Sequence, residues 1–238
     1  MSSSIPYQVR ISPRARHVYL RISMEKGLEV VVPRGYSVSG IPSIVAKKQR
    51  WIERTLARLE KRRQAQPVVE EKKLPEQINL PAIGESWRVE YVCAKSGSVR
   101  ATEVEHGVLR LTGEVHHLNT CARVLQKWLI KRASQVLPGW LRQVSEEVNL
   151  PFAKVAIRLQ RSRWGSCSHA RTISLNAKLL FLAPAVVRYL FLHELCHTVH
   201  MNHSQRYWNL VEAKAPGYRE QDGALRTAMS LVPWWAKR

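Results

Sequence analysis

The residues best suited to chemistry lie in one stretch, residues 193–197, with the sequence His-Glu-Leu-Cys-His. On an α-helix, residues four positions apart share a face and lie about 6 Å apart along the axis, so His193 and His197 can hold one metal ion between them. Glu194 is rotated by about 100° around the helix, which sets its carboxylate beside the open position of that metal. The stretch therefore predicts a metal ion that activates water, with Glu194 as the general base.

A catalytic zinc ion usually takes three protein ligands and keeps a fourth position for water. A straight helix excludes His200, because its ring lies too far along the axis for a zinc–nitrogen bond of about 2.1 Å. Asn202 is expected to end the helix in a left-handed turn that brings His203 back toward the metal. The expected ligands of one Zn²⁺ ion are therefore His193, His197 and His203. Glu212 stays open as an alternative third ligand, since a carboxylate is equally competent at zinc.

The spacing His-Glu-x-x-His is the motif of zinc peptidases, but a motif with three fixed positions also arises by chance. Residues 183–192 are almost entirely apolar, with Pro184 in the first turn, and this pattern predicts a buried helix that carries both histidines near its end. Burying histidines and a glutamate in such a helix is costly unless they are paired or ligated. The context therefore favours a metal site over a chance match.

Composition limits the class of protein. The chain has 238 residues, enough for one or two domains, and 45% of them are hydrophobic. No apolar run reaches the roughly 18 residues of a membrane span, and the N-terminus lacks the order of a signal peptide. We therefore expect a cytoplasmic protein without a membrane partner. The four cysteines are scattered without a Cys-x-x-Cys pair, which indicates buried thiols and neither disulfides nor a cysteine–zinc cage.

The charge is strongly positive. Lys and Arg number 38 against 18 Asp and Glu, a net charge of +20. Such a surface attracts polyanions, either nucleic acid or acidic protein substrates. Many of the cations lie on one face of a helix predicted over residues 42–63. They are Lys47, Lys48, Arg50, Arg54, Arg58, Lys61, Arg62 and Arg63. This face is interpreted either as a solvated surface or as a contact for nucleic acid.

Hydrophobic periodicity predicts the remaining elements. A β-hairpin is expected within residues 7–32, turning at 24–27, and residues 64–77 have the composition of a linker. Short strands are expected at 87–93, 98–104 and 108–112, with a turn at His106-Gly107. A long helix capped by Asn119 or Thr120 should be kinked or split by Pro138. Two strands, at 153–160 and 172–180, then precede the helix that carries His193.

Several segments together resemble the YgjP-like metallopeptidases, which are relatives of the SprT-like zinc proteases, nearly from end to end. The segments are residues 12–21 (SPRARHVYLR), 32–35 (VPRG), 163–168 (RWGSCS), 173–176 (ISLN), 193–197 (HELCH) and 201–204 (MNHS). The resemblance implies zinc on His193, His197 and His203 with Glu194 as base. Ala177 and Lys178 depart from the usual Trp-Arg pair and Arg171 from a turn glycine, and these departures are expected to alter the cleft wall.

The expected fold is α+β: a zincin-like metallopeptidase domain preceded by a β-rich N-terminal region with one basic helix. The predicted divisions are 1–66 for the hairpin and basic helix, 67–77 for a linker, 78–118 for a β-rich segment and 119–238 for the catalytic domain. The expected activity is zinc-dependent hydrolysis of protein or peptide substrates, with Arg163 or Tyr218 as a donor to the oxyanion. The alternatives are a nucleic-acid-associated protein with a structural or vestigial zinc site, and a DNA-tethered SprT-like protease.

Overall fold

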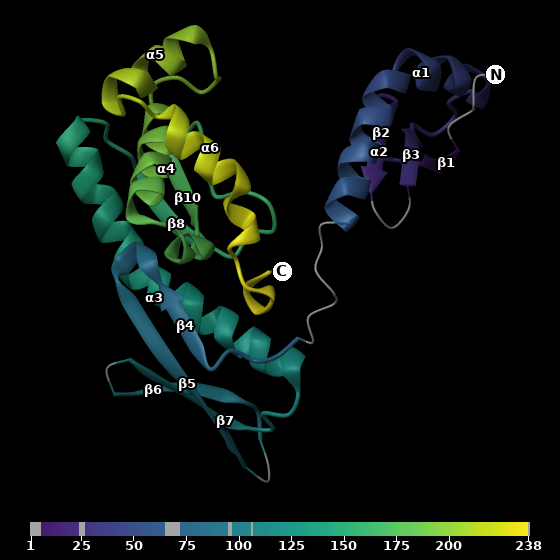
Figure 1. Ribbon diagram of the computed structural model, residues 1–238. Helices are drawn as coiled ribbons and strands as arrows, with labels where there is room; N and C mark the ends of the chain where they lie inside the picture. Colours follow the sequence, from purple (N-terminus) through teal and green to yellow (C-terminus); the bar gives the residue numbers. More distant parts are fainter. Residues whose placement is uncertain (1–5, 24–26, 65–71, 95–96, 106, 238) are drawn as a thin grey trace. The chain divides into compact units, whose positions relative to one another are not determined.

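The computed structural model describes residues 6–23, 27–64, 72–94, 97–105 and 107–237 (Figure 1). The chain divides into two compact units, Met1–Glu71 and Lys72–Arg238. Each unit has its own hydrophobic core. The predicted linker falls partly on residues 65–71, and the predicted turns fall partly on 24–26 and on His106, all of which lie outside the described residues.

The first unit contains a three-stranded sheet with the order β1-β3-β2. Strand β2 (Tyr19–Ser23) pairs antiparallel with β3 (Gly27–Val32), which confirms the predicted hairpin. Strand β1 (Tyr7–Ile11) adds on the other side of β3 in parallel, an arrangement that the alternating pattern did not indicate. The central strand β3 is buried almost throughout, because both of its neighbours and the helices cover it.

The basic helix of the first unit is two helices, α1 (Ile41–Lys47) and α2 (Gln49–Gln64), so the prediction of one continuous helix was wrong. The break lies at Lys48, whose φ of −108° and ψ of 9° are not helical. Ile41, Val45 and Ile52 are buried against the sheet. Trp51 was expected in the apolar stripe but is 48% exposed, while its neighbour Ile52 is fully buried.

The second unit begins with a four-stranded sheet in the order β4-β5-β7-β6. The strands are β4 (Gln77–Leu80), β5 (Glu85–Cys93), β6 (Arg100–Glu105) and β7 (Val108–Gly113). Three of the four match predicted strands, and β4 was not predicted. One face of the sheet packs on α3 (Leu118–Val148), and residues from the sheet and from the C-terminal half of the chain share a single core.

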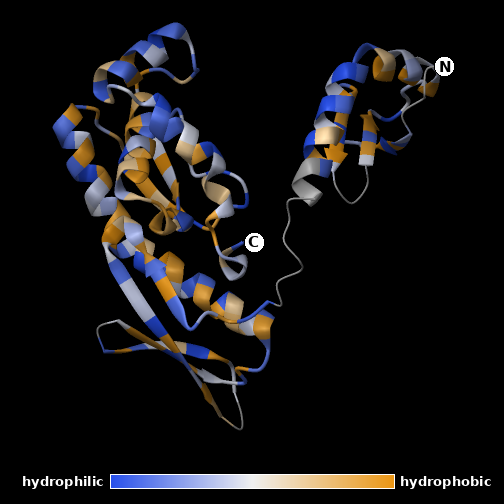
Figure 2. Ribbon diagram, viewed as in Figure 1, coloured by the Kyte–Doolittle hydropathy of each residue, from blue (hydrophilic) through white to orange (hydrophobic). Residues whose placement is uncertain are grey.

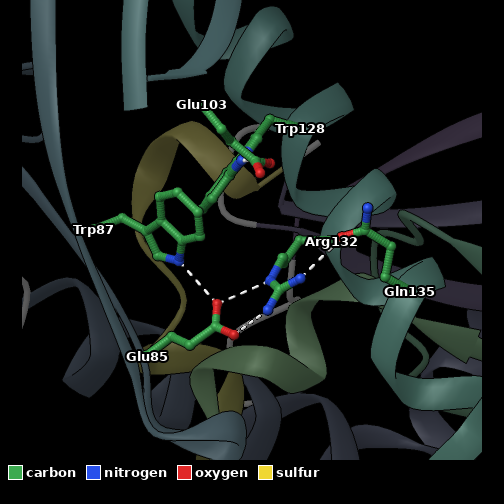
Figure 3. Close-up of polar contacts among 6 residues, drawn as sticks. All are labelled: Glu85, Trp87, Glu103, Trp128, Arg132 and Gln135. Carbon is green, nitrogen blue, oxygen red and sulfur yellow. Dashed lines mark hydrogen bonds and ion pairs between the residues drawn. The ribbon is translucent and has the colours of Figure 1, made fainter. Parts of the chain in front are cut away.

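Polar contacts fasten α3 to this sheet (Figure 3). Glu85 of β5 accepts hydrogen bonds from both Arg132 of α3 and the indole N–H of Trp87, the latter at 2.9 Å. The Trp87 and Trp128 rings meet edge to face at 5.4 Å, and Trp128 donates to Glu103 of β6 at 3.0 Å. The Glu85–Arg132 pair is mostly buried and bidentate, a geometry that is stronger than an exposed ion pair.

Helix α3 differs from prediction at both points where the sequence suggested a boundary. It begins after His117, so neither Asn119 nor Thr120 is its N-cap, and it is assigned as one helix through Pro138. Proline removes one backbone hydrogen bond and crowds the preceding turn. Leu137 and Leu141 are fully buried on either side of it, and this tertiary packing keeps the helix continuous.

The last part of the chain positions the candidate site. A second sheet has the order β8-β10-β9, with β8 (Lys154–Arg158) parallel and β9 (Gly165–Cys167) antiparallel to β10 (Thr172–Asn176). The predicted strand 172–180 ends early, because the Asn176 side chain caps a short 3₁₀ helix, Ala177–Phe181. The strands next to α4 contain hydrophobic residues, which are orange in Figure 2.

Helix α4 (Pro184–Cys196) carries His193 and Glu194 and packs against α3, α5 (Gln205–Lys214) and α6 (Arg219–Thr227) (Figure 1). It opens with Pro184 in its first turn and is largely buried, as the apolar run predicted. The architecture is a mixed α+β fold, which confirms the predicted class. None of the described helices is long and apolar enough to cross a membrane.

Candidate metal centre

Three histidine rings converge at the end of α4. One ring nitrogen from each of His193, His197 and His203 lies within 4.8 Å of the others, and the Nε2 atoms of His193 and His203 are 3.3 Å apart. Ligand atoms placed tetrahedrally about 2.1 Å from a zinc ion are about 3.4 Å from one another. The His193–His203 pair has this spacing, and the third nitrogen lies close enough for all three rings to converge on one metal ion.

The turn after α4 brings His203 back by a different route from the one predicted. His197 follows the last helical residue with right-handed backbone angles, and the N–H groups of Thr198 and His200 still bond to carbonyls of the last turn. Within the described residues, the only non-glycine residues with positive φ are Asn149 and Arg171, so Asn202 makes no left-handed turn. Ser204 caps α5, which places His203 immediately before the helix.

The two rejected or alternative ligands have other roles. The backbone carbonyl of His200 lies 3.0 Å from Nδ1 of His197, so it accepts a hydrogen bond that leaves Nε2 of His197 free for a metal. The carboxylate of Glu212 instead accepts from the backbone of Gly217 and faces Arg219. Glu212 is therefore engaged away from the three histidines.

Aromatic rings enclose the histidines. Tyr207 stacks on His197 at 4.5 Å, and its hydroxyl donates to the backbone carbonyl of His193 at 3.1 Å. Trp208 stacks on His203 at 5.6 Å. Because both aromatic residues belong to α5, the helix that follows the turn also fixes the orientation of the rings. These contacts with the histidines were not foreseen from the sequence, because they depend on how α5 packs against α4.

Burial sets the protonation of the ligands. Burial, together with the neighbouring His197 and His203, lowers the pKa of His193 to about 4. Burial also lowers the pKa of His197. Both rings are therefore neutral near pH 7, which is the form in which histidine binds a metal.

Glu194 is 4% exposed and lies against β9. A Cβ atom on Gly165 would lie 2.6 Å from Oε1 of Glu194, so the absence of a side chain at Gly165 makes room for the carboxylate. Within the described residues, Oε2 of Glu194 is buried without a hydrogen-bond partner. Burial raises the pKa of Glu194 to about 8. A buried carboxylate with an unpartnered oxygen, beside three converging imidazoles, is suited to a metal site with a base.

The Gly165 contact leads to a prediction. Gly165→Ala is expected to displace the Glu194 carboxylate and to lower peptidase activity at least about tenfold, while zinc content and fold remain, because Gly165 has ordinary backbone angles. The control is Gly139→Ala in α3, where a Cβ atom meets nothing within 4 Å. Full activity in Gly165→Ala would show that Glu194 does not work from this position. Activity and zinc content of both variants check the prediction.

The two predicted oxyanion donors are placed differently. The Tyr218 ring is 9% exposed and stacks on Trp208 at 5.3 Å, so it belongs to the aromatic cluster around the histidines. Arg163 lies in the loop between β8 and β9, and its side chain has no hydrogen bond or ion pair among the described residues. The structure therefore brings Tyr218 to the cluster, whereas no contact among the described residues joins the Arg163 side chain to it.

Two of the three departures from the family pattern are buried. Ala177 is fully buried and Lys178 is 1% exposed, with its ammonium group donating to the carbonyl of Gln160 at 2.8 Å. Burial lowers the pKa of Lys178. Both side chains are too buried to touch a substrate, so any change that they make to the cleft wall is indirect. Arg171 has a φ of 50°, the left-handed region that explains why glycine is usual there.

Three imidazoles thus converge beside the buried Glu194 at the end of α4, within a mixed α+β fold. The family model described as YgjP-like, metallopeptidase domain, matches residues 16–228. The chain belongs to the YgjP-like metallopeptidase family, which confirms the resemblance seen in the sequence.

Two solved structures are similar over part of the chain. The metallopeptidase zymogen abylysin of Pyrococcus abyssi is 24% identical with a TM-score of 0.36, over 40% of this chain and 96% of that one. The metallopeptidase zymogen jannalysin of Methanocaldococcus jannaschii is 18% identical with a TM-score of 0.33, over 39% of this chain and 93% of that one. No curated protein matches the chain.

Proposed function

We propose that this metallopeptidase is an endopeptidase that uses one zinc ion bound by His193, His197 and His203, with Glu194 as general base. The observation that carries the proposal is the convergence of three imidazole nitrogens within 4.8 Å of one another, next to the buried carboxylate of Glu194 on α4. Imidazole suits zinc, and three protein ligands leave a position for water.

Each group has a distinct role in the proposed reaction. A zinc ion at this site supplies a Lewis acid that polarises the scissile carbonyl and lowers the pKa of water. Glu194 takes a proton from the attacking water and passes it to the leaving amine. Because burial raises the pKa of Glu194 to about 8, the carboxyl group can both accept and return a proton near neutral pH.

The edge strand β9 offers a place for the substrate backbone. The carbonyl of Trp164 accepts from Asn176 and the N–H of Ser168 donates to Thr172, so alternate residues of this segment bond to β10. The N–H and C=O groups of Gly165 and Cys167 then point to the open side, where no other described strand pairs with β9. An extended peptide can add there as a further strand. Glu194 touches Gly165, so such a peptide would pass beside the base.

Tyr218 is the proposed donor to the oxyanion of the tetrahedral intermediate. Its support is its place in the aromatic cluster, one ring removed from His203. Arg163 lacks comparable support and stays a prediction from the sequence. The cytoplasmic location and the nucleic-acid partner predicted from the sequence likewise stay predictions.

The rival hypothesis of a structural or vestigial metal site explains Glu194 poorly. A structural zinc ion needs no base, and a buried carboxylate without a partner costs stability. Among the described residues, Oε2 of Glu194 has no such partner. A catalytic role as general base would explain why the protein tolerates this loss of stability.

Elemental analysis of the purified protein and a casein cleavage assay test the proposal. We expect about one zinc ion per chain, cleavage within the casein chain, loss of both on treatment with a chelator, and recovery on adding zinc. A protein that retains zinc but cleaves no peptide would favour the structural-site hypothesis. A protein that cleaves casein equally well without metal would exclude the proposed mechanism.

A further inference from the structure

The first unit has a hollow that the peptidase chemistry does not use. It lies beside the edge strand β2, has a volume of about 290 Å³, and is lined by Val18, Tyr19, Leu20, Ile44, Lys48 and Trp51. Tyr19 is 51% exposed and Trp51 is 48% exposed. Single exposed apolar residues are ordinary, but two large aromatic rings that line the same hollow indicate a surface for binding.

Cations surround these rings. Arg54 and Arg58 follow Trp51 at three and seven residues, so they lie on the same face of α2. Arg21 follows Tyr19 by two residues, so both side chains lie on the same face of β2. All three arginines are exposed, and Lys48 lines the hollow itself.

Few acidic groups balance these cations. Among the described residues, Lys48, Arg54 and Arg58 form no ion pair, and Arg21 has only a long contact of 4.0 Å with Glu29. In the sequence, residues 1–71 contain fourteen Lys or Arg and six Asp or Glu. The surface around the hollow therefore favours an anionic ligand.

The combination of rings and cations selects among anionic ligands. A single-stranded nucleic acid presents both phosphates and unpaired bases, and bases stack on exposed aromatic rings. A duplex keeps its bases stacked inside and offers mainly phosphates to such a surface. An acidic peptide would satisfy the cations and leave the two rings without a partner. Exposed rings among unpaired cations thus fit a single strand best.

We propose that this hollow and its surrounding cations bind single-stranded nucleic acid. Bases stack on Tyr19 and Trp51, while Lys48, Arg54 and Arg58 contact phosphates. The site lies in the first unit, whereas all the proposed zinc ligands lie in the second. Binding of nucleic acid and peptide cleavage can therefore be removed separately by mutation.

The test is fluorescence anisotropy of the full-length protein with a labelled 20-nucleotide oligo(dT) and with a duplex of the same length, over a series of salt concentrations. The oligo(dT) should bind more tightly than the duplex, and log K should fall linearly with log salt at about −0.7 per phosphate contacted. The double variant Tyr19→Ala/Trp51→Ala should lose at least about tenfold in affinity for oligo(dT), with little change of the salt slope.

Charge reversal gives the complementary result. Arg54→Glu/Arg58→Glu should weaken binding and also reduce the salt slope, because phosphate contacts are lost. Val38→Ala, at a position 60% exposed in the same unit, and Arg142→Glu, exposed on α3, are the matched controls and should bind like the wild type. Zinc content and casein cleavage should be unchanged in every variant.

Three results would overturn the proposal. The first is affinity for oligo(dT) no tighter than about 0.1 mM at physiological salt. The second is an affinity that is unchanged in the aromatic double variant and equal for single strand and duplex. That result would show that the surface binds polyanions through its charge alone. The third is competition by poly-glutamate as strong as that by oligo(dT), which would indicate an acidic protein partner. The peptidase proposal would survive all three results, because it depends on zinc content and casein cleavage alone.

Discussion

Glu194→Gln is expected to lower the rate of peptide cleavage at least about a hundredfold while the protein keeps its fold and its zinc. Glutamine has nearly the same shape as glutamate, so it fits in the space beside Gly165, but it cannot take a proton from water. None of the three proposed metal ligands is altered. Casein cleavage and zinc content measured on the same preparation check the result. Undiminished cleavage would remove Glu194 as the base.

The same variant tests the environment of the carboxylate in the metal-free protein. Burial raises the pKa of Glu194 from 4.5 to about 8, so between these values the folded protein binds more protons than the unfolded chain, and stability falls as pH rises. Glutamine does not ionise, so the variant does not lose stability in this way as pH rises. The metal-free variant should therefore match the wild type near pH 4.5 and exceed it by a few kcal/mol at pH 8, measured by chemical unfolding. Equal stability at both pH values would show that the carboxylate is solvated.

The sequence predicted those parts of the site that depend on local spacing. His193 and His197 lie four residues apart on one helix, and the apolar run before them predicted that helix with its first turn at Pro184. His203 was placed beside them correctly in space, but through a left-handed turn at Asn202 that does not exist. The placement of His203 does not depend on that turn, because any tight reversal after α4 brings the chain back past the helix end.

The contacts that were missed join residues far apart in the chain. Gly165 makes room for Glu194 from a strand 29 positions earlier, and no periodicity in the sequence couples the two. The stacking of Tyr207 on His197 likewise depends on the angle between α4 and α5. Two predictions about helix continuity were wrong in opposite ways. The hydrophobic pattern continues through Lys48, where the helix is interrupted, and the helix continues through Pro138, where local propensity predicts a break. In each case tertiary packing outweighs a local preference.

His203→Ala is expected to weaken zinc binding at least about a hundredfold, because it removes one of the three proposed ligands. Loss of a residue that only supports a metal ligand already lowers metal affinity about ten- to a hundredfold, so loss of the ligand itself should lower it at least as much. His203 is exposed and precedes the Ser204 cap, so its replacement should leave α5 in place. Competition with a chromophoric chelator measures the affinity, and circular dichroism checks the fold.

Two controls separate His203 from its neighbours. His200→Ala should bind zinc nearly as well as the wild type, because His200 contacts His197 through its backbone carbonyl, which alanine retains. Glu212→Ala should also retain zinc, since the Glu212 carboxylate contacts Gly217 and Arg219. If Glu212→Ala lost zinc and His203→Ala kept it, the third ligand would be a carboxylate reached through a movement of α5. The order of the three affinities therefore decides which residue completes the site.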